Sequence, residues 1–111
     1  MKKLREFKGG KLKLDNNLLI KDENGTFLAG DIRVNENIGL TAIQTIFARE
    51  HNRQCEIYAI KHPGLSDEAI FRMARNKVVG FIQKICFDEY LPLLLGQEIF
   101  DKFIGEYQGY D

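Results

Sequence analysis

An arginine and a glutamate in the segment 30–37 have the residue types and the spacing that could support chemistry. Arg33 and Glu36 stand three residues apart, just before an expected helix. If that helix begins early, both side chains lie on one side of it. They could then form a structural ion pair, which spacing alone favours. The guanidinium could instead line a pocket, where a permanent cation polarises a bound oxygen species and stabilises developing negative charge.

The two histidines and the two cysteines indicate no further site. His51 and the preceding Glu50 point about 100° apart on a helix, so they cannot easily share one metal ion. His62 stands in a turn before a proline. Cys55 and Cys86 lack the Cys-x-x-Cys spacing of zinc and redox sites, and both fall in expected helices. Buried, inert thiols are therefore the favoured interpretation, and we expect no metal site.

Two long amphipathic helices and a short N-terminal hairpin are expected to position these residues. Residues 1–30 combine short apolar runs with the turn-forming pair Asn24-Gly25, which favours irregular chain with a short hairpin. Residues 37–60 and 67–87 carry apolar side chains at helical spacing. Residues 88–111 are expected to form short helical turns, because a proline and a glycine interrupt them. The predicted fold class is mainly α.

Each long helix has a predicted apolar face. In the helix at 37–60 this stripe consists of Leu40, Ile43, Phe47 and Tyr58, bordered by Ile46 and Ile57. The opposite side is predicted to carry Thr41, Thr45, Arg49, Asn52 and Glu56. Polar residues such as His51 intrude beside the stripe, so this helix is expected to pack against hydrogen-bond partners. The helix at 67–87 is predicted to bury Ile70, Phe71, Ala74, Val78, Phe81, Ile82 and Ile85.

Composition and charge exclude several classes of protein. A length of 111 residues suits one domain, and 44% hydrophobic with 29% charged residues argues against wholesale disorder. The 16 basic and 16 acidic residues cancel, whereas a nucleic-acid binder needs surplus positive charge. No run approaches the roughly 18 apolar residues of a membrane span. Residues 1–13 are basic but precede no apolar core, so we favour a solvated basic strand over a signal peptide.

The order of several motifs resembles the animal-type haem peroxidases. The segment Ala-Gly-Asp-Ile-Arg-Val-Asn-Glu at 29–36 precedes Leu-Thr at 40–41 and Arg-Glu-His-Asn-Arg at 49–53. The resemblance continues through Asp-Glu at 67–68, Ala-Arg at 74–75 and Asp-Glu-Tyr-Leu-Pro-Leu-Leu-Leu-Gly at 88–96. Residues 4–13 and 107–111 also resemble the family, so the resemblance covers nearly the whole chain. It implies that the chain is part of a helical peroxidase domain.

The resemblance implies roles for the arginine and the glutamate. The family's Gly-Asp-x-Arg-x-x-Glu motif contains the distal arginine that helps a distal histidine to split hydrogen peroxide on haem iron. Arg33 matches that catalytic residue. Glu36 matches the glutamate that forms an ester with a haem methyl in several members. Asn37 stands where some members have a methionine linked to haem, so that sulfonium bond is excluded here. Gln44 replaces a frequent histidine that is not the iron ligand.

The departures from the family pattern lead to a further expectation. The family's distal histidine and calcium-binding aspartate precede the segment that resembles 4–13, and its proximal histidine follows the segment that resembles 107–111. His51 and His62 match neither histidine. We therefore expect an internal piece of a peroxidase domain that is inactive alone, because an axial ligand and a base are both needed.

The implied partners belong to the parent domain. The resemblance implies haem, calcium, hydrogen peroxide and a small donor or halide there, and flanking parts of the domain as partners of this chain. Family members are mostly secreted, but the compartment of this chain stays unknown. The alternative function is a non-catalytic helical assembly or interaction module, since two long helices alone leave apolar surface exposed.

Overall fold

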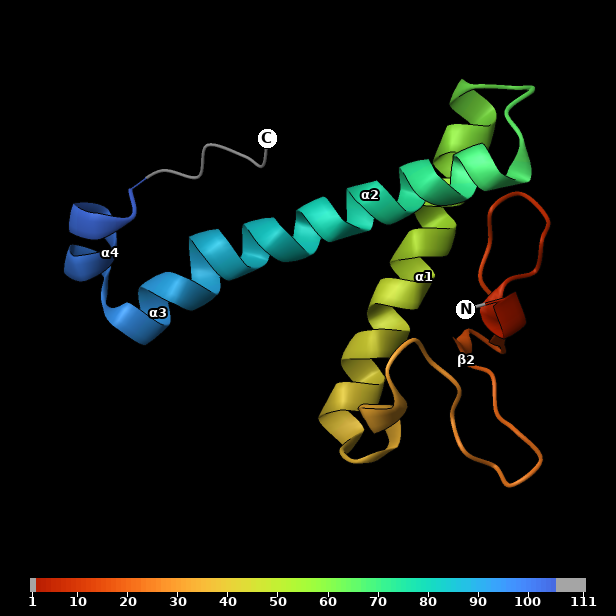
Figure 1. The fold of residues 1–111 in the computed structure, drawn as a ribbon, viewed down its shortest axis with the longest axis horizontal. Helices are drawn as coiled ribbons and strands as arrows, with labels where there is room; N and C mark the ends of the chain where they lie inside the picture. Colours follow the sequence, from red (N-terminus) through yellow and green to blue (C-terminus); the bar gives the residue numbers. More distant parts are fainter. Residues whose placement is uncertain (1, 106–111) are drawn as a thin grey trace. The chain divides into compact units, whose positions relative to one another are not determined.

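The computed structural model describes residues 2–105, so the segment 107–111 used in the resemblance lies outside the described residues. In chain order the elements are η1 Lys2–Leu4, β1 Leu14–Asp15, β2 Leu18–Leu19, η2 Ile32–Asn35, α1 Ile38–Lys61, α2 Asp67–Ile85, η3 Cys86–Tyr90, α3 Leu91–Leu95 and α4 Gln97–Phe103 (Figure 1). The chain is mainly α with two long helices and a short hairpin, as predicted. It divides into two compact units, 1–78 and 79–111.

The N-terminal hairpin forms earlier in the chain than expected. Strands β1 and β2 pair antiparallel, with Leu14 opposite Leu19. Asn16 and Asn17 join them with φ angles of 48° and 62°. Asparagine tolerates this left-handed region better than most residues, and a two-residue hairpin turn requires it at both positions. The predicted turn at Asn24-Gly25 also forms, but only an isolated bridge closes it.

The packed face of α1 is more polar than predicted. Its buried residues are Thr45, Ala48, His51, Gln54 and Cys55. Ile43 and Ile46, from the predicted apolar stripe, are instead 55% and 58% exposed. Thr45, expected on the exposed side, is buried. One reason is that this face meets residues 4–13, which we call the N-terminal strap, and the strap backbone bonds to Asn52 and Cys55. Thr45 and Gln54 instead bond to Thr41 and Glu50 within α1.

The start of α2 follows the expected capping pattern. The Ser66 hydroxyl accepts a hydrogen bond from the Ala69 amide at 3.2 Å. Asp67 and Glu68 add negative charge in the first turn, where the helix dipole favours it. The buried residues of the helix are the predicted Ile70, Phe71, Ala74 and Val78. Ile82 and Ile85, also predicted to pack, are exposed in the second unit.

The second unit contains the end of α2 and three short helical segments. The helix passes at Cys86 into a π-helical turn, η3, and then into α3. Pro92 stands in the first turn of α3, directly after this π-helical turn, so the regular α-helix is interrupted just before the proline. Phe100 of α4 is buried, and its ring lies 5.4 Å from that of Phe87. Cys86 is exposed, which corrects the expectation of two buried thiols.

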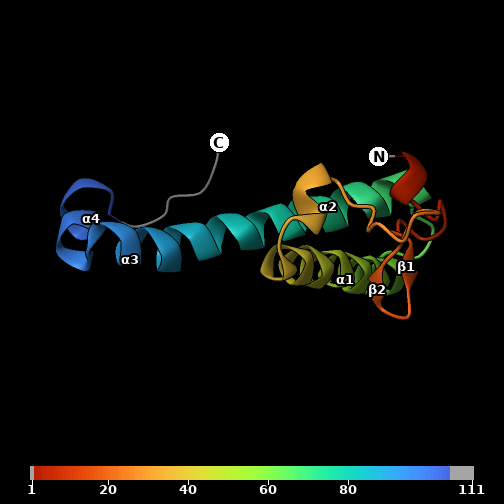
Figure 2. The same cartoon turned by 90° about the horizontal axis from the view of Figure 1, so that it is seen from below.

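Two small apolar clusters stabilise the first unit. One contains Leu19, Val34 and Ala48, and it joins the hairpin and η2 to α1. Figure 2 shows the hairpin next to α1. The other contains Cys55, Ile70 and Ala74, and it joins α1 to α2. Val34 is 1% exposed, so η2 is anchored in the core by the residue that follows Arg33. Within residues 2–105, every helix is too short or too polar to cross a membrane.

Candidate functional site

The segment that carries Arg33 and Glu36 is a single 3-10 turn between the hairpin and α1. It begins because Asp31, in extended conformation, accepts a hydrogen bond from the Arg33 amide at 2.9 Å. It ends where the Glu36 amide donates to the Arg33 carbonyl at 2.9 Å. Asn37 then caps α1 by accepting a bond from the Gly39 amide at 2.7 Å. Two side-chain caps therefore enclose the turn.

Arg33 pairs with Asp31, so the ion pair with Glu36 that spacing favours is wrong. The Arg33 Nη2 and Nε atoms lie 2.6 Å and 3.0 Å from the Asp31 Oδ2 and Oδ1 atoms. These hydrogen bonds, together with the bond from the Arg33 amide, lower the pKa of Asp31 to about 2. The carboxylate of Asp31 already caps the turn, so it lies nearer to the guanidinium than Glu36 does. Among the residues that the structure describes, the Glu36 carboxylate has no hydrogen-bond or ion-pair partner.

The outer side of this turn combines charge with exposed apolar surface. The Arg33 side chain is 67% exposed, and Glu36 is also exposed. Ile32 and Ile38, on either side of them in the sequence, are 94% and 87% exposed. A guanidinium, a carboxylate and two large apolar side chains therefore face away from the core of the first unit. Such a surface can contact an apolar ligand that carries a polar reacting group.

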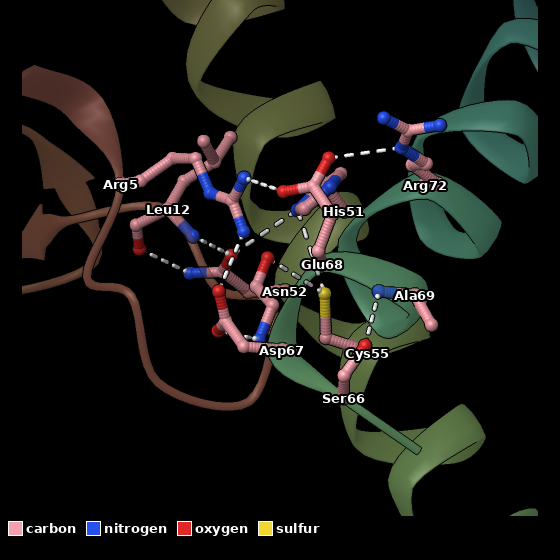
Figure 3. Close-up of polar contacts among 11 residues, drawn as sticks. Arg5, Leu12, His51, Asn52, Cys55, Ser66, Asp67, Glu68, Ala69 and Arg72 are labelled. Carbon is pink, nitrogen blue, oxygen red and sulfur yellow. Dashed lines mark hydrogen bonds and ion pairs between the residues drawn. The ribbon is translucent and has the colours of Figure 1, made fainter. Parts of the chain in front are cut away.

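A second polar constellation, which the sequence analysis missed, lies where the N-terminal strap meets both long helices (Figure 3). Arg5 is 7% exposed rather than solvated, which corrects the expectation for the basic strand at this residue. Its Nη2 atom lies 2.6 Å from the Asp67 Oδ2 atom, and its Nη1 atom bonds to Glu68. The guanidinium carbon lies 4.0 Å from the ring centre of Phe71. The sequence did contain a signal for this contact, because the strap is basic and the start of α2 is acidic.

The strap is also bound to α1. The Asn52 amide accepts a hydrogen bond from the Leu12 amide and donates one to the Leu12 carbonyl, both at 2.8 Å. The Cys55 thiol donates to the Gly10 carbonyl at 3.3 Å. Burial raises the pKa of this thiol to about 11, so it stays protonated and inert, as expected. These contacts hold the strap against α1. They leave Cys55 as a protonated thiol rather than a nucleophile.

His51 lies in the same buried constellation. Its Nδ1 atom is 3.4 Å from the Asn52 Oδ1 atom and 3.7 Å from the Cys55 sulfur. Its ring centre is 5.1 Å from that of Phe71. Burial lowers the pKa of His51, since desolvation disfavours the imidazolium. In the described part of the chain, no group of three His, Cys, Asp or Glu residues could hold a metal ion.

Acidification should destabilise the first unit through His51. The folded-state pKa lies below the ordinary 6.5, so the unfolded chain binds more protons once the pH falls below 6.5. The side chains facing His51 are Asn52 and Cys55 on α1, Phe71 on α2 and Arg5 on the strap, and the cation of Arg5 opposes protonation. We therefore expect thermal melts followed by circular dichroism to show a falling Tm between pH 7 and pH 5.

Two histidine variants check this prediction. His51→Gln should flatten the dependence of Tm on pH over this range, because the titrating group is gone. His62→Gln, in the exposed turn after α1, should keep the wild-type slope. A wild-type slope in His51→Gln would show that another group causes the acid sensitivity.

Comparisons with known proteins agree over most of the chain. Residues 1–111 match the family described as animal haem peroxidase. The chain is 48% identical to Peroxidase mlt-7 of Caenorhabditis elegans over 86 residues, which cover 78% of this chain and 12% of that protein. It therefore spans about an eighth of that relative.

Solved structures show the same architecture. A fatty acid alpha-dioxygenase of Arabidopsis thaliana has a TM-score of 0.78 and 29% identity, over 97% of this chain and 20% of that one. Peroxidase A of Dictyostelium discoideum has a TM-score of 0.73 and 32% identity, over 99% of this chain and 24% of that one. This mainly helical fold thus recurs as a part of proteins that are several times longer.

Proposed function

Because the chain belongs to the animal haem peroxidase family, we propose that it forms the part of a haem pocket that carries Arg33 and Glu36. The observation that carries this proposal is the surface of η2. There an exposed guanidinium and a carboxylate without a described partner are flanked in the sequence by two exposed isoleucines.

These residues fit the chemistry of haem. Ile32 and Ile38 offer apolar contact to a flat macrocycle, and Arg33 offers a cation that stabilises an anionic oxygen. The Glu36 carboxylate, which has no described partner, would be available for the ester to a haem methyl that the resemblance implies. That bond would need hydrogen peroxide as a two-electron oxidant. Haem, when bound, supplies the redox chemistry by which hydrogen peroxide oxidises a small donor or a halide. We assign both haem and calcium to the parent domain rather than to this chain alone.

We further propose that the isolated chain is inactive. Haem iron needs a protein axial ligand, and peroxide cleavage needs a base near the iron. His51 lies roughly 20 Å along α1 from Ile38, at the helical rise of about 1.5 Å per residue, and it is buried. His62 follows the far end of the same helix. Neither described histidine can therefore serve a reacting group at Arg33, and flanking parts of the domain must supply one.

The test of this proposal compares the chain with the parent domain. The purified 111-residue chain mixed with hemin should show no defined Soret shift and no oxidation of guaiacol. In the haem-loaded parent domain, Arg33→Gln should lower peroxide turnover about 100-fold, as removal of one charge-stabilising donor does elsewhere. Arg72→Gln, which changes an exposed arginine of α2, is the control and should keep full turnover. Robust turnover by the chain alone would contradict the inactive assignment.

A non-catalytic assembly module is the second candidate function. The observation that favours it is the exposed apolar surface of the second unit, formed by Tyr90, Leu93, Leu94, Ile99 and Phe103. Apolar patches of this kind mark surfaces that contact other protein segments. Size-exclusion chromatography should then show self-association at micromolar concentration. A compact, monodisperse monomer would count against this candidate.

A further inference from the structure

One side chain ties the turn η2 to the chain that precedes it. The Phe27 amide donates to the Asn35 Oδ1 atom, and the Asn35 Nδ2 atom donates to the Phe27 carbonyl, both at 2.9 Å. An asparagine amide has one acceptor and two donor hydrogens, so it can satisfy a whole backbone peptide position in this way. The backbone at Phe27 is thereby fixed to a residue eight positions later.

A second residue of the turn, Val34, is held by burial. Val34 is 1% exposed and packs against Leu19 and Ala48. The Thr41 hydroxyl donates to the Val34 carbonyl. Val34 and Asn35 therefore bind the turn to the hairpin side and to α1, while the neighbouring Arg33 and Glu36 face outward. Val34, which is buried, and Asn35, which is exposed but bonded through both amide atoms, hold the backbone that carries Arg33 and Glu36.

We propose that Asn35 is a positioning residue for Arg33 and Glu36, and this rests on the function proposed for that pair. The Arg33 side chain is 67% exposed and its carboxylate partner Asp31 belongs to the same turn. Among residues 2–105, Asp31 is the only ion-pair partner of the guanidinium, so its location depends on the backbone of the turn. Reacting groups must be held to within about 0.5 Å, which an untethered surface turn does not achieve. The Asn35 amide supplies a second anchor beside Val34, on the side of the turn that meets Phe27.

The chain provides a matched control for this role. Asn52 makes the same two hydrogen bonds with the Leu12 backbone, both at 2.8 Å, on the strap. Asn35→Asp and Asn52→Asp thus make the same chemical change, which turns a donor into a carboxylate oxygen facing a carbonyl. The first variant affects the turn that carries Arg33. The second affects the strap and the structural constellation around His51.

The experiment is ¹⁵N NMR on the 111-residue chain without haem. In Asn35→Asp, the carboxylate oxygen that replaces the Nδ2 atom repels the Phe27 carbonyl and opens the pair. The Phe27 amide should then exchange about tenfold faster, in line with the loss of about one net hydrogen bond. The heteronuclear NOE of the Arg33 Nε and of the Glu36 amide should fall as well. In Asn52→Asp, these three signals should keep their wild-type values, while the Leu12 amide exchanges faster. If these three signals change in Asn35→Asp and not in Asn52→Asp, Asn35 positions the turn rather than stabilising the whole unit.

Two results would overturn the proposal. One is an unchanged Arg33 Nε signal in Asn35→Asp, and the other is an equal change in Asn52→Asp. If Asn35→Asp does not fold, Asn35→Ser removes both bonds without adding charge and is judged by the same signals. Because no haem is present, failure here concerns Asn35 alone, whereas failure of the hemin and turnover tests concerns the proposed function.

Discussion

Replacing Gly10 by alanine should detach the N-terminal strap from both long helices and lower the free energy of unfolding by about 3 kcal/mol. A Cβ atom at this position would lie 2.6 Å from the Phe71 amide nitrogen and 2.9 Å from the Ile70 Cγ2 atom. The nearer atom belongs to the backbone of α2, so a side-chain rotation cannot relieve the overlap. The φ angle of +72° adds strain for any residue with a Cβ atom.

The overlap would also break hydrogen bonds. The Gly10 amide donates to the Asp67 Oδ1 atom at 2.7 Å, and its carbonyl accepts from the Cys55 thiol at 3.3 Å. If the strap lifts to make room, both bonds lengthen together. A buried polar group that loses its partner carries a free-energy penalty of about 1–3 kcal/mol, which is why a single methyl group has so large an expected effect.

Gly9 is the control for this substitution. It also has a positive φ, +59°, but a Cβ atom there would meet nothing within 4 Å. Gly9→Ala should therefore show only the backbone strain, about 1 kcal/mol. Urea unfolding followed by circular dichroism measures both variants against the wild-type chain. Equal losses in the two variants would contradict the close approach of the strap to α2.

The two long helices were predictable because their signals are local. Apolar spacing, the Ser66 cap and the acidic residues at the start of α2 all lie within a few residues of the structure that they specify. The face that α1 packs was not predictable in the same way. Some of its polar residues are satisfied by partners 40 or more positions away, namely Leu12 for Asn52 and Gly10 for Cys55. Periodicity alone cannot show that a polar face will meet the backbone of a distant strap.

The candidate site was also predictable only in part. Spacing and resemblance identified Arg33 and Glu36, but spacing alone favoured the wrong ion-pair partner. Asp31 takes the guanidinium because it already caps the turn, and a cap depends on local backbone geometry that spacing does not encode. Asn35 was missed because its partner is a backbone position, which no side-chain pattern marks. The sequence offered only one sign of this role, which is that Asn35 follows Val34, the buried residue of the turn.

Arg5→Ala should have the other large effect, a loss of about 2–3 kcal/mol in the free energy of unfolding. The Arg5 side chain is 9% exposed, and it binds the Asp67 carboxylate at 2.6 Å. Its guanidinium carbon also lies 4.0 Å from the ring centre of Phe71 and 5.0 Å from that of Phe7. Asp67 is 28% exposed and keeps its bond to the strap, so the loss stays below that of a fully buried pair.

Arg72 supplies the matched control, since it binds the same Glu68 carboxylate as Arg5. The Arg72 side chain is 74% exposed, and solvent screens its ion pair. Arg72→Ala should therefore leave the midpoint of urea unfolding unchanged. Arg5→Lys should fall between the two, because an ammonium keeps the charge but loses the planar fork and most of the contact with Phe71.

The salt dependence of stability distinguishes surface charge attraction of Arg5 from its buried ion pair and its contact with the Phe71 ring. Exposed charges are screened at 1 M salt, where the Debye length is about 3 Å, whereas a buried pair and a ring contact are screened much less. The difference in urea midpoint between Arg5→Ala and wild type should thus persist from 0.1 M to 1 M sodium chloride. If the difference vanishes in high salt, the strap is held by surface charge alone. In that case the burial of Arg5 between Phe71 and Asp67 would not be what fixes the strap to α2.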